Sequence, residues 1–303
     1  MDEPSGVRSS QARRLARLGV FTLAVLGALA GIVTLFMHLA TDPLADVRAY
    51  YDAGARLNAG LPLYPADADP NAAEFYRYPP LLAIAFRPLA LLPFPAAAAI
   101  WEAVVIASLL GTLWWVGIRR RETWLAVGIL GVPIAWCVAI GQAQVPVTFL
   151  TAVGGPWSIA LAANIKLFPA LIAVWWIGRR DRRALGLFAA WLAGLALLQL
   201  VLEPQATIDF LGTLTTEQVG EVRNISPYVV SPLLWAVLAG AGVVVTLRVA
   251  PARWGWAAAV GLSVLATPRL LVYMLMTFLA ALREPAGPSV SIPDRTGGPM
   301  GRR

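Results

Sequence analysis

Three charged residues, Asp46, Lys166 and Arg269, are candidates for a role in catalysis or binding. Asp46 opens a predicted helix directly after a long apolar run, and a carboxylate in that place could take a proton as a general base. Lys166, the only lysine, lies between apolar runs at 157–165 and 167–178, and Arg269 interrupts a later run. A charge inside such runs is unfavourable unless it is paired, lines a polar cavity or reaches the interface. Lys166 and Arg269 therefore either line a polar cavity or snorkel to the interface. For Asp46 the alternative to a general base is a first-turn acid favoured by the helix dipole.

One long polar segment, residues 41–80, must position Asp46. It contains five of the seven tyrosines and six of the 17 acidic residues. Asp42 before a proline resembles a helix N-cap, and an Asn-Ala-Gly sequence resembles a helix end, so the pattern predicts a helix near 43–59. Tyr50 follows Asp46 by four residues, which puts both on one side of that helix, lying along the membrane surface.

The remaining polar residues of this segment have more than one interpretation. Tyr50 and Tyr78 are the better candidates for stacking on a bound ligand, whereas the other tyrosines fit an aromatic belt at the membrane interface. Asp67 and Asp69 form a short acidic triplet that resembles metal-binding acids. Such triplets are common by chance, and this one lies in a loop rich in Pro and Ala, so we expect no metal site.

The composition indicates an integral membrane protein. Of the 303 residues, 58% are hydrophobic and only 14% are charged, and the mean hydropathy is +0.68. A soluble domain could not cover that much apolar surface. The net charge of +7 comes from arginines at the ends of apolar runs, which is typical of cytoplasmic loops and not of a nucleic-acid interface. Cys137 is the sole cysteine, so no intrachain disulfide can form.

Apolar runs long enough to cross a bilayer, about 20 residues, occur along most of the chain. The clearest are 18–40, 96–118, 123–165 with room for two crossings, 184–202 and 231–246. We expect an all-α bundle of eight to ten membrane segments, with both termini cytoplasmic and an ordered first external loop. The expected organisation is a basic N-terminus at 1–17, one membrane domain at 18–283 with external loops at 41–80 and 203–230, and a disordered cytoplasmic tail at 284–303.

Two shorter stretches connect these runs. The sequence Gly-Gln-Ala-Gln at 141–144, called the GQAQ loop below, is expected to be an outward turn. Arginine and prolines break 81–95, which favours a short or re-entrant segment. Arg87 in that segment and Glu102 are both expected near the outer face, where they would form a structural ion pair.

Seven motifs in a fixed order give the chain a family resemblance. They are DVRAYYDAG, GLPLY, YRYPPLLAIAFRPLALLP, GQAQ, NIKLFPALIAVWW, NISPY and ATPRLLVY. In this order they make the chain resemble glycosyltransferase family 87, and the resemblance runs from about residue 46 to about residue 282. The resemblance implies the GT-C fold and a mannosyltransferase that uses polyprenyl-phosphate-mannose.

Such a transfer needs a base near the acceptor hydroxyl and positive groups near the departing phosphate, which suggests roles for individual residues. An inverting transfer would use Asp46 as the general base, and Lys166 and Arg269 would contact the donor phosphate. Substrate contacts would come from Tyr50, Tyr78, Gln142 and Asn224. The implied acceptor is an extracytoplasmic glycolipid or glycan at the plasma membrane, and no cofactor, metal or nucleic acid is implied. The chain contains no glycine-rich phosphate loop in a strand-to-helix setting, so no nucleotide site is expected.

Two other classes of function fit some of these features. Intramembrane charges and broken helices also mark transporters, so a flippase of a lipid-linked sugar is one alternative. The polar residues concentrate on one face, which favours an enzyme. The other alternative is an inactive family member that acts as an assembly partner, because the only histidine, His38, lies in the first apolar run and the stretch after the GQAQ loop is short.

Overall fold

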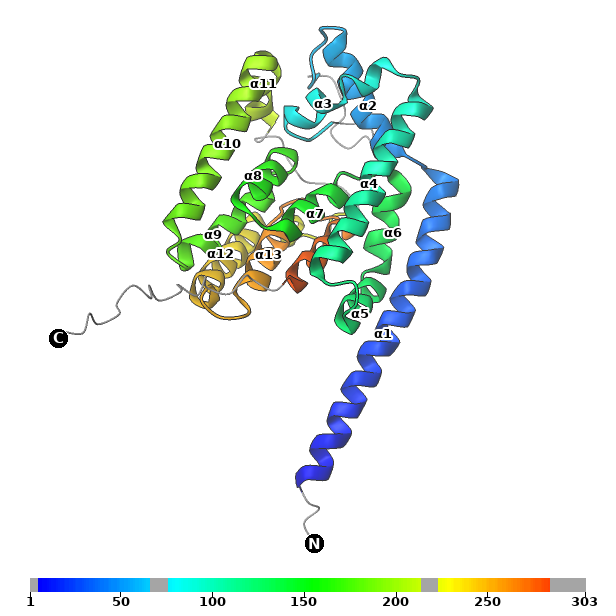
Figure 1. Cartoon of the computed structure of the whole chain (residues 1–303), viewed down its shortest axis with the longest axis vertical. Coiled ribbons are helices and arrows are strands. Elements are labelled where there is room, and N and C mark those ends of the chain that lie inside the picture. Colours follow the sequence, from blue (N-terminus) through cyan, green and yellow to red (C-terminus); the bar gives the residue numbers. More distant parts are fainter. Residues whose placement is uncertain (1–4, 66–75, 214–222, 284–303) are drawn as a thin grey trace, which may run out of the picture.

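The computed structural model describes residues 5–65, 76–213 and 223–283, and all the regular structure in these ranges is helical (Figure 1). The expected all-α fold is confirmed. The elements are α1 (Ser5–Thr41), α2 (Ala45–Asn58), α3 (Pro80–Phe86), η1 (Leu89–Leu91), α4 (Phe94–Val116), α5 (Arg121–Ile129), α6 (Gly131–Ile140), α7 (Gln144–Val153), α8 (Pro156–Ile165), η2 (Phe168–Ile172), α9 (Ala173–Gly178), α10 (Arg182–Leu202), α11 (Pro204–Thr213), η3 (Pro227–Val229), α12 (Pro232–Val249), α13 (Gly255–Leu265) and η4 (Val272–Leu282).

Four described helices are long and apolar enough to cross a membrane: α1, α4, α10 and α12. The pair α5 and α6 passes the same test as one span bent by 69°. Four further apolar segments have only 10 or 11 residues. A helix of that length measures about 15 Å, half of the roughly 30 Å hydrocarbon layer. The polytopic architecture is therefore confirmed. Among the described residues, four helices are able to cross a membrane, or five if the bent pair is one span, against the eight to ten membrane segments that we expected.

Glycines let α1 dock closely on the bent α5–α6 pair. A Cβ atom added to Gly27 would lie 2.4 Å from the carbonyl oxygen of Gly128, and one added to Gly31 would lie 2.6 Å from the carbonyl carbon of Gly131. The backbones therefore touch directly, as small residues allow in membrane helix pairs. The rest of α1 presents large apolar side chains to its surroundings, among them Leu23, Val33 and Phe36.

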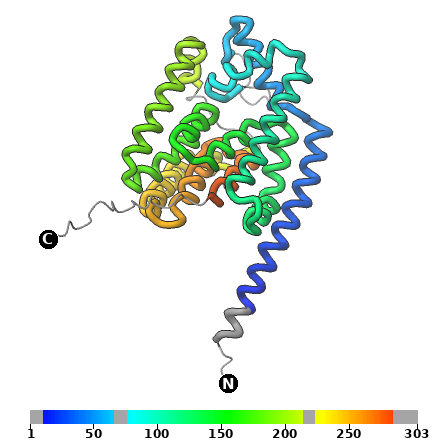
Figure 2. Tube along the Cα trace, in the orientation of Figure 1, coloured from blue at the N-terminus to red at the C-terminus, as the bar shows by residue number. Residues whose placement is uncertain are grey.

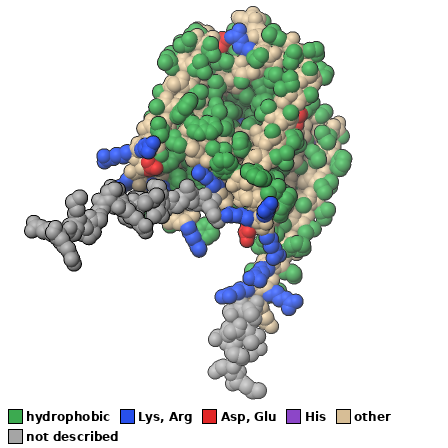
Figure 3. Space-filling model, viewed as in Figure 1, with side chains coloured by type: hydrophobic (Ala, Val, Ile, Leu, Met, Phe, Trp, Pro, Cys, Tyr) green, Lys and Arg blue, Asp and Glu red, His purple; other side chains and the backbone are tan. Residues whose placement is uncertain are grey.

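The two ends of the bundle differ in charge. Figure 1 shows α2, α3 and α11 together at the end farthest from the N-terminus of α1. Basic side chains gather at the opposite end, as Figure 3 shows. They come from the start of α1 and from the ends of the spans, at 119–121, 179–183, Arg248 and Arg253. Between these ends, α7 packs against α4, and α8 packs against α10 (Figure 2).

The predicted helix after the first span is present, but Asp42 does not cap it. The helix α2 begins at Ala45, and the N-cap residue is Leu44, in the left-handed region with φ 58°. The Asp42 carboxylate instead lies 2.7 Å from Nδ1 of His38 and accepts a hydrogen bond of 2.7 Å from Thr41. The prediction failed because the backbone N–H of Leu44 donates to the Ala139 carbonyl of α6, which delays the start of the helix.

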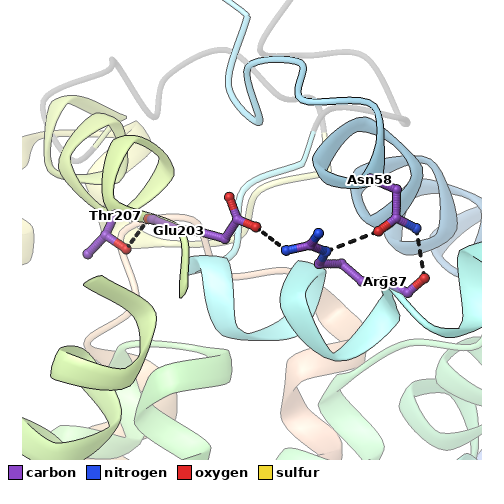
Figure 4. A network of polar contacts seen from close by, with 4 residues as sticks. All are labelled: Asn58, Arg87, Glu203 and Thr207. Atoms are coloured by element: carbon purple, nitrogen blue, oxygen red, sulfur yellow. Dashed lines mark hydrogen bonds and ion pairs between the residues drawn. The ribbon is translucent and has the colours of Figure 1, made fainter. Parts of the chain in front are cut away.

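The expected ion pair between Arg87 and Glu102 is also wrong. Arg87 pairs with Glu203 at the junction of α10 and α11, and its Nε donates to Asn58 at 3.0 Å (Figure 4). This network joins α2, the end of α3 and α10. Glu102 lies elsewhere, since a Cβ atom added to Gly141 would be 2.5 Å from its Oε1 atom. The fold therefore separates the two residues by placing α3 on the α10 side of the molecule.

Candidate active site

The helix α2 directs Asp46 and Tyr50 toward the protein interior. They are four residues apart and share one side of the helix. The same side buries Ala53, Gly54 and Leu57, so it packs into the protein and does not lie along the membrane surface. The Asp46 side chain stays partly exposed, whereas Tyr50 is completely buried. The carboxylate is thus held at the edge of the packed core.

Gln142 connects Asp46 to two tyrosines. Its Nε2 atom donates to Oδ2 of Asp46 at 2.8 Å, and its Oε1 atom accepts from the hydroxyls of Tyr50 at 2.8 Å and Tyr78 at 3.0 Å. The two hydroxyls lie 3.1 Å apart. Gln142 is only 1% exposed. Every polar atom of its side chain therefore has a protein partner, and Gln142 holds the other site residues in place.

The geometry of the GQAQ loop depends on Gly141. This residue ends α6 with φ 68°, a conformation that favours glycine. Its carbonyl accepts a 2.7 Å hydrogen bond from the indole of Trp101, which fixes the loop to α4. The chain then turns at once into α7, which begins with Gln144. The two glutamines of the loop are thereby held only two residues apart, in the interior of the molecule.

Lys166 extends into the same site from the end of α8. Its Nζ atom donates to Oε1 of Gln144 at 2.9 Å and lies 5.2 Å from the ring centre of Tyr78 and 4.9 Å from that of Tyr273. Both distances are within the range of a cation–π interaction. The ammonium group is therefore directed into the protein, which disfavours a snorkelling side chain.

The electrostatics of Asp46 suit a proton acceptor. Burial raises the pKa of its carboxyl to about 7, although the positive charges of Lys166 and Arg77 act in the opposite direction. The charge of Asp42 adds a smaller upward shift. A group with a pKa near the working pH is suited to general base catalysis, because it can both accept and release a proton.

The other two predicted site residues, Asn224 and Arg269, lie on two loops that are joined by hydrogen bonds. Asn224 donates to the Pro268 carbonyl at 3.1 Å, and its Oδ1 accepts from the backbone N–H groups of Ser226 and Leu270, both at 3.0 Å. Asn224 thus stabilises the loop that carries Arg269. Arg269 is partly exposed and is within electrostatic reach of the Tyr273 phenol.

The structure brings together Asp46, Tyr50, Tyr78, Gln142 and Lys166, and it adds residues that the sequence reasoning missed. The added residues are Arg77, Gln144, Tyr273 and Thr277. Arg77, Gln144 and Tyr273 belong to the same motifs as predicted site residues, so motif membership was the available signal for them; Thr277 lies outside the motifs. Asp67 and Asp69 lie outside the described residues, and the described ranges contain no group of three His, Cys, Asp or Glu side chains suited to a metal ion.

Comparison with known proteins identifies the family. Two similar proteins carry the name polyprenol-phosphate-mannose-dependent alpha-(1-2)-phosphatidylinositol pentamannoside mannosyltransferase. The protein from Mycolicibacterium smegmatis is 31% identical over 244 residues, which cover 74% of this chain and 57% of the relative. The protein from Mycobacterium tuberculosis is 30% identical over 211 residues, which cover 61% of this chain and 47% of the relative. The chain thus spans about half the length of these relatives.

No solved structure matches the chain significantly. The sequence profile of glycosyltransferase family 87 matches residues 75–287, which include Tyr78, the GQAQ loop, Lys166 and Arg269. The match begins after α2, so it does not bear on Asp46. Because the matched range covers more than half of the chain, this protein belongs to glycosyltransferase family 87.

Proposed function

We propose that this protein is a membrane mannosyltransferase that moves mannose from a polyprenyl-phosphate carrier to a glycolipid or glycan acceptor. One observation supports this above all: a partly buried carboxylate and an inward-facing ammonium group are held by the two glutamines of the GQAQ loop. Family membership and the names of the two relatives agree with this donor class.

Asp46 is the proposed general base. In the reaction, a hydroxyl oxygen of the acceptor forms a bond to the anomeric carbon of the donor sugar, on the face opposite the phosphate. The bond between that carbon and the phosphate oxygen breaks, and its electron pair stays on the departing polyprenyl phosphate. The acceptor proton moves to Asp46. Because attack and departure occur on opposite faces, the anomeric configuration inverts.

Lys166 is the proposed partner of the departing phosphate. An ammonium group has three N–H donors, and one of them is used by Gln144. The other two are available for phosphate oxygens, where negative charge grows as the bond breaks. Arg269 is proposed as a second cation for this group. Tyr78 is the tyrosine that keeps some exposed surface for the sugar, since Tyr50 is fully buried.

The distribution of charge supports a site on the extracytoplasmic side. The arginine clusters gather at the end of the bundle opposite α2 and α3 (Figure 3). Cytoplasmic loops of membrane proteins carry an excess of Lys and Arg. On this basis α2 and α3 face outward and the basic start of α1 faces the cytoplasm.

Transfer by the purified full chain in lipid vesicles tests this function. The vesicles contain native membrane lipids and either labelled polyprenyl-phosphate-mannose or labelled GDP-mannose. We expect a labelled lipid or glycan product from the polyprenyl donor alone. Product from GDP-mannose alone, or no product from either donor, would contradict the proposal. Movement of the intact donor across the vesicle membrane without transfer would support a flippase instead.

Substitution of Lys166 tests the assignment of the phosphate partner. We expect Lys166→Met to raise the KM for the polyprenyl donor about tenfold or more, since a charge-assisted contact to phosphate is lost. Arg253→Met is the matched control, because Arg253 is an exposed cation far along the chain from the site. An unchanged KM in Lys166→Met would remove Lys166 from the donor site.

A further inference from the structure

We propose that Gln142 and Gln144 are a pair of positioning residues, one holding the base and the other holding the phosphate-binding cation, with their amide groups fixed in opposite orientations. Gln142 presents its NH₂ group to Asp46, and Gln144 presents its carbonyl oxygen to Lys166. The inference deepens the proposed function and rests on it for the roles of Asp46 and Lys166.

The neighbours of Gln142 allow only one orientation of its amide. The backbone N–H of Gln144 points at the Oε1 position from 3.3 Å, and a backbone N–H can only donate. The Tyr50 hydroxyl, which accepts from the N–H of Ala143, can donate to this Oε1 atom or to the Tyr78 hydroxyl, and the Tyr78 hydroxyl can itself donate to Oε1. The oxygen must therefore face this group of donors. The NH₂ group is left to face Asp46.

This orientation decides which oxygen of Asp46 takes the proton. Its Oδ2 atom already accepts from Gln142. A proton on Oδ2 would face the N–H donor of the amide, which is repulsive. The acceptor proton therefore goes to Oδ1, and Gln142 stabilises the ionised form of the carboxylate that is able to act as a base.

A chain of threonine hydroxyls fixes Gln144 in the opposite sense. The Thr148 hydroxyl donates to the backbone carbonyl of Gln144 at 2.8 Å. In its 2.9 Å contact with Thr277, Thr148 must then be the acceptor, so Thr277 donates. With its proton used, Thr277 accepts from Nε2 of Gln144 at 2.7 Å. The side-chain oxygen of Gln144, Oε1, is consequently directed toward Lys166.

Both amides are occupied by protein partners and are almost inaccessible. Gln142 is 1% exposed and Gln144 is 6% exposed. Their low exposure leaves little surface for a direct contact with a sugar. Because only Ala143 separates the two residues, a shift of the loop moves the base and the cation together. The loop thus sets the spacing between the proton acceptor and the departing phosphate.

Two isosteric substitutions should change different kinetic parameters if the pair works in this way. The groups that face Asp46 are the charges of Lys166, Arg77 and Asp42 and the phenols of Tyr50 and Tyr78. Gln142→Glu replaces the donor to Asp46 by a second carboxyl group. We expect kcat to fall about a hundredfold, the acidic limb of the kcat/KM profile to move to higher pH by a unit or more, and the donor KM to change little.

Gln144→Glu places a carboxylate beside the Lys166 ammonium and neutralises it. We expect the donor KM to rise about tenfold. The acidic limb should move to higher pH by less than in Gln142→Glu, because a carboxylate beside Lys166 offsets only part of the positive charge that lowers the pKa of Asp46. Gln205→Glu, at an exposed position on α11, is the control for adding a carboxylate. Wild-type kinetics in both loop variants, or the same change in both, would overturn the proposal. If Gln142→Glu does not yield folded protein, Gln142→Met tests the same loss of the donor.

A measurement without catalysis keeps the proposal separate from the proposed function. Lys166 is the only lysine, so reductive methylation with ¹³C-formaldehyde labels one side chain besides the amino terminus. In the purified full chain in detergent, Gln144→Leu should shift the Lys166 resonance and lower its titration midpoint, because the acceptor for the ammonium group is lost. Gln205→Leu should leave it unchanged. An unshifted Gln144→Leu spectrum would contradict the contact between Gln144 and Lys166 even if the wild type transfers mannose. A shifted spectrum without transfer by the wild type would refute only the proposed mannosyltransferase function.

Discussion

Lowering the pH below 7 should reduce kcat/KM about tenfold for each pH unit, because only the ionised form of Asp46 can accept a proton. Burial raises the pKa of this carboxyl to about 7. With that value, about half of the protein carries ionised Asp46 at pH 7, about a tenth at pH 6 and about a hundredth at pH 5. An unperturbed aspartate would stay ionised throughout this range. The position of the acidic limb therefore reports the burial of Asp46.

Lys166 provides the second half of the same prediction. Its positive charge lowers the pKa of Asp46, against the effect of burial. In Lys166→Met that opposing effect is lost, so the acidic limb should move to higher pH. Arg253→Met removes an exposed cation at another place and should leave the limb unchanged. The comparison separates a local charge effect from a change in net charge.

The assay is the initial rate of mannose transfer from the polyprenyl donor between pH 5 and pH 9. The donor phosphate is a diester and does not titrate in this range, so kcat/KM reports groups of the free protein. A rate that is constant from pH 5 to pH 8 would refute the assignment of Asp46 as a buried base. A limb that does not move in Lys166→Met would refute the electrostatic contact between the two residues.

Three other predictions concern the stability of the fold and the packing of α1. Because the folded state raises the pKa of Asp46, ionisation destabilises the fold progressively as pH rises from about 4 to about 7; Asp46→Asn should therefore raise the melting temperature at pH 8 and raise it less at pH 5, and equal effects at both values would contradict this. Gly27→Leu should separate α1 from α5 and α6, since even a Cβ atom would lie 2.4 Å from a backbone oxygen; cross-linking of α1 to α6 should be lost, whereas Gly19→Leu, with open space around it, should retain it. A double-mutant cycle of Arg87→Met and Glu203→Gln in thermal unfolding should give a coupling of about 1 kcal/mol or less, because the pair is partly exposed; a coupling of several kcal/mol would indicate that the bridge is a main support of α3.

The sequence was sufficient for the features that depend on local pattern. The long apolar runs predicted α1, α4, α10 and α12, since about 20 apolar residues are a strong and local signal. The four-residue spacing of Asp46 and Tyr50 correctly put both on one side of α2. Five predicted site residues also lie together in the structure, and the set of family motifs, not a local pattern, indicated them.

The features that the sequence did not predict depend on contacts between distant parts of the chain. Gln142 meets Asp46 across 96 residues, so the sequence could not indicate this contact. Arg87 pairs with Glu203 across 116 residues, and the nearer Glu102 was an equally plausible partner before the place of α3 was known. Asp42 fits the N-cap pattern, but a hydrogen bond from Leu44 to another helix sets the start of α2.

Sugar transfer by Asp46→Asn tests the central claim most directly. Wild type, Asp46→Asn and Asp52→Asn are compared at equal protein in vesicles with labelled polyprenyl-phosphate-mannose. Asp52 is an exposed aspartate on the same helix and serves as the matched control. We predict a fall in kcat of about a hundredfold or more in Asp46→Asn and a rate near wild type in Asp52→Asn, as expected for loss of a general base. Equal rates in wild type and Asp46→Asn would contradict the account of this site.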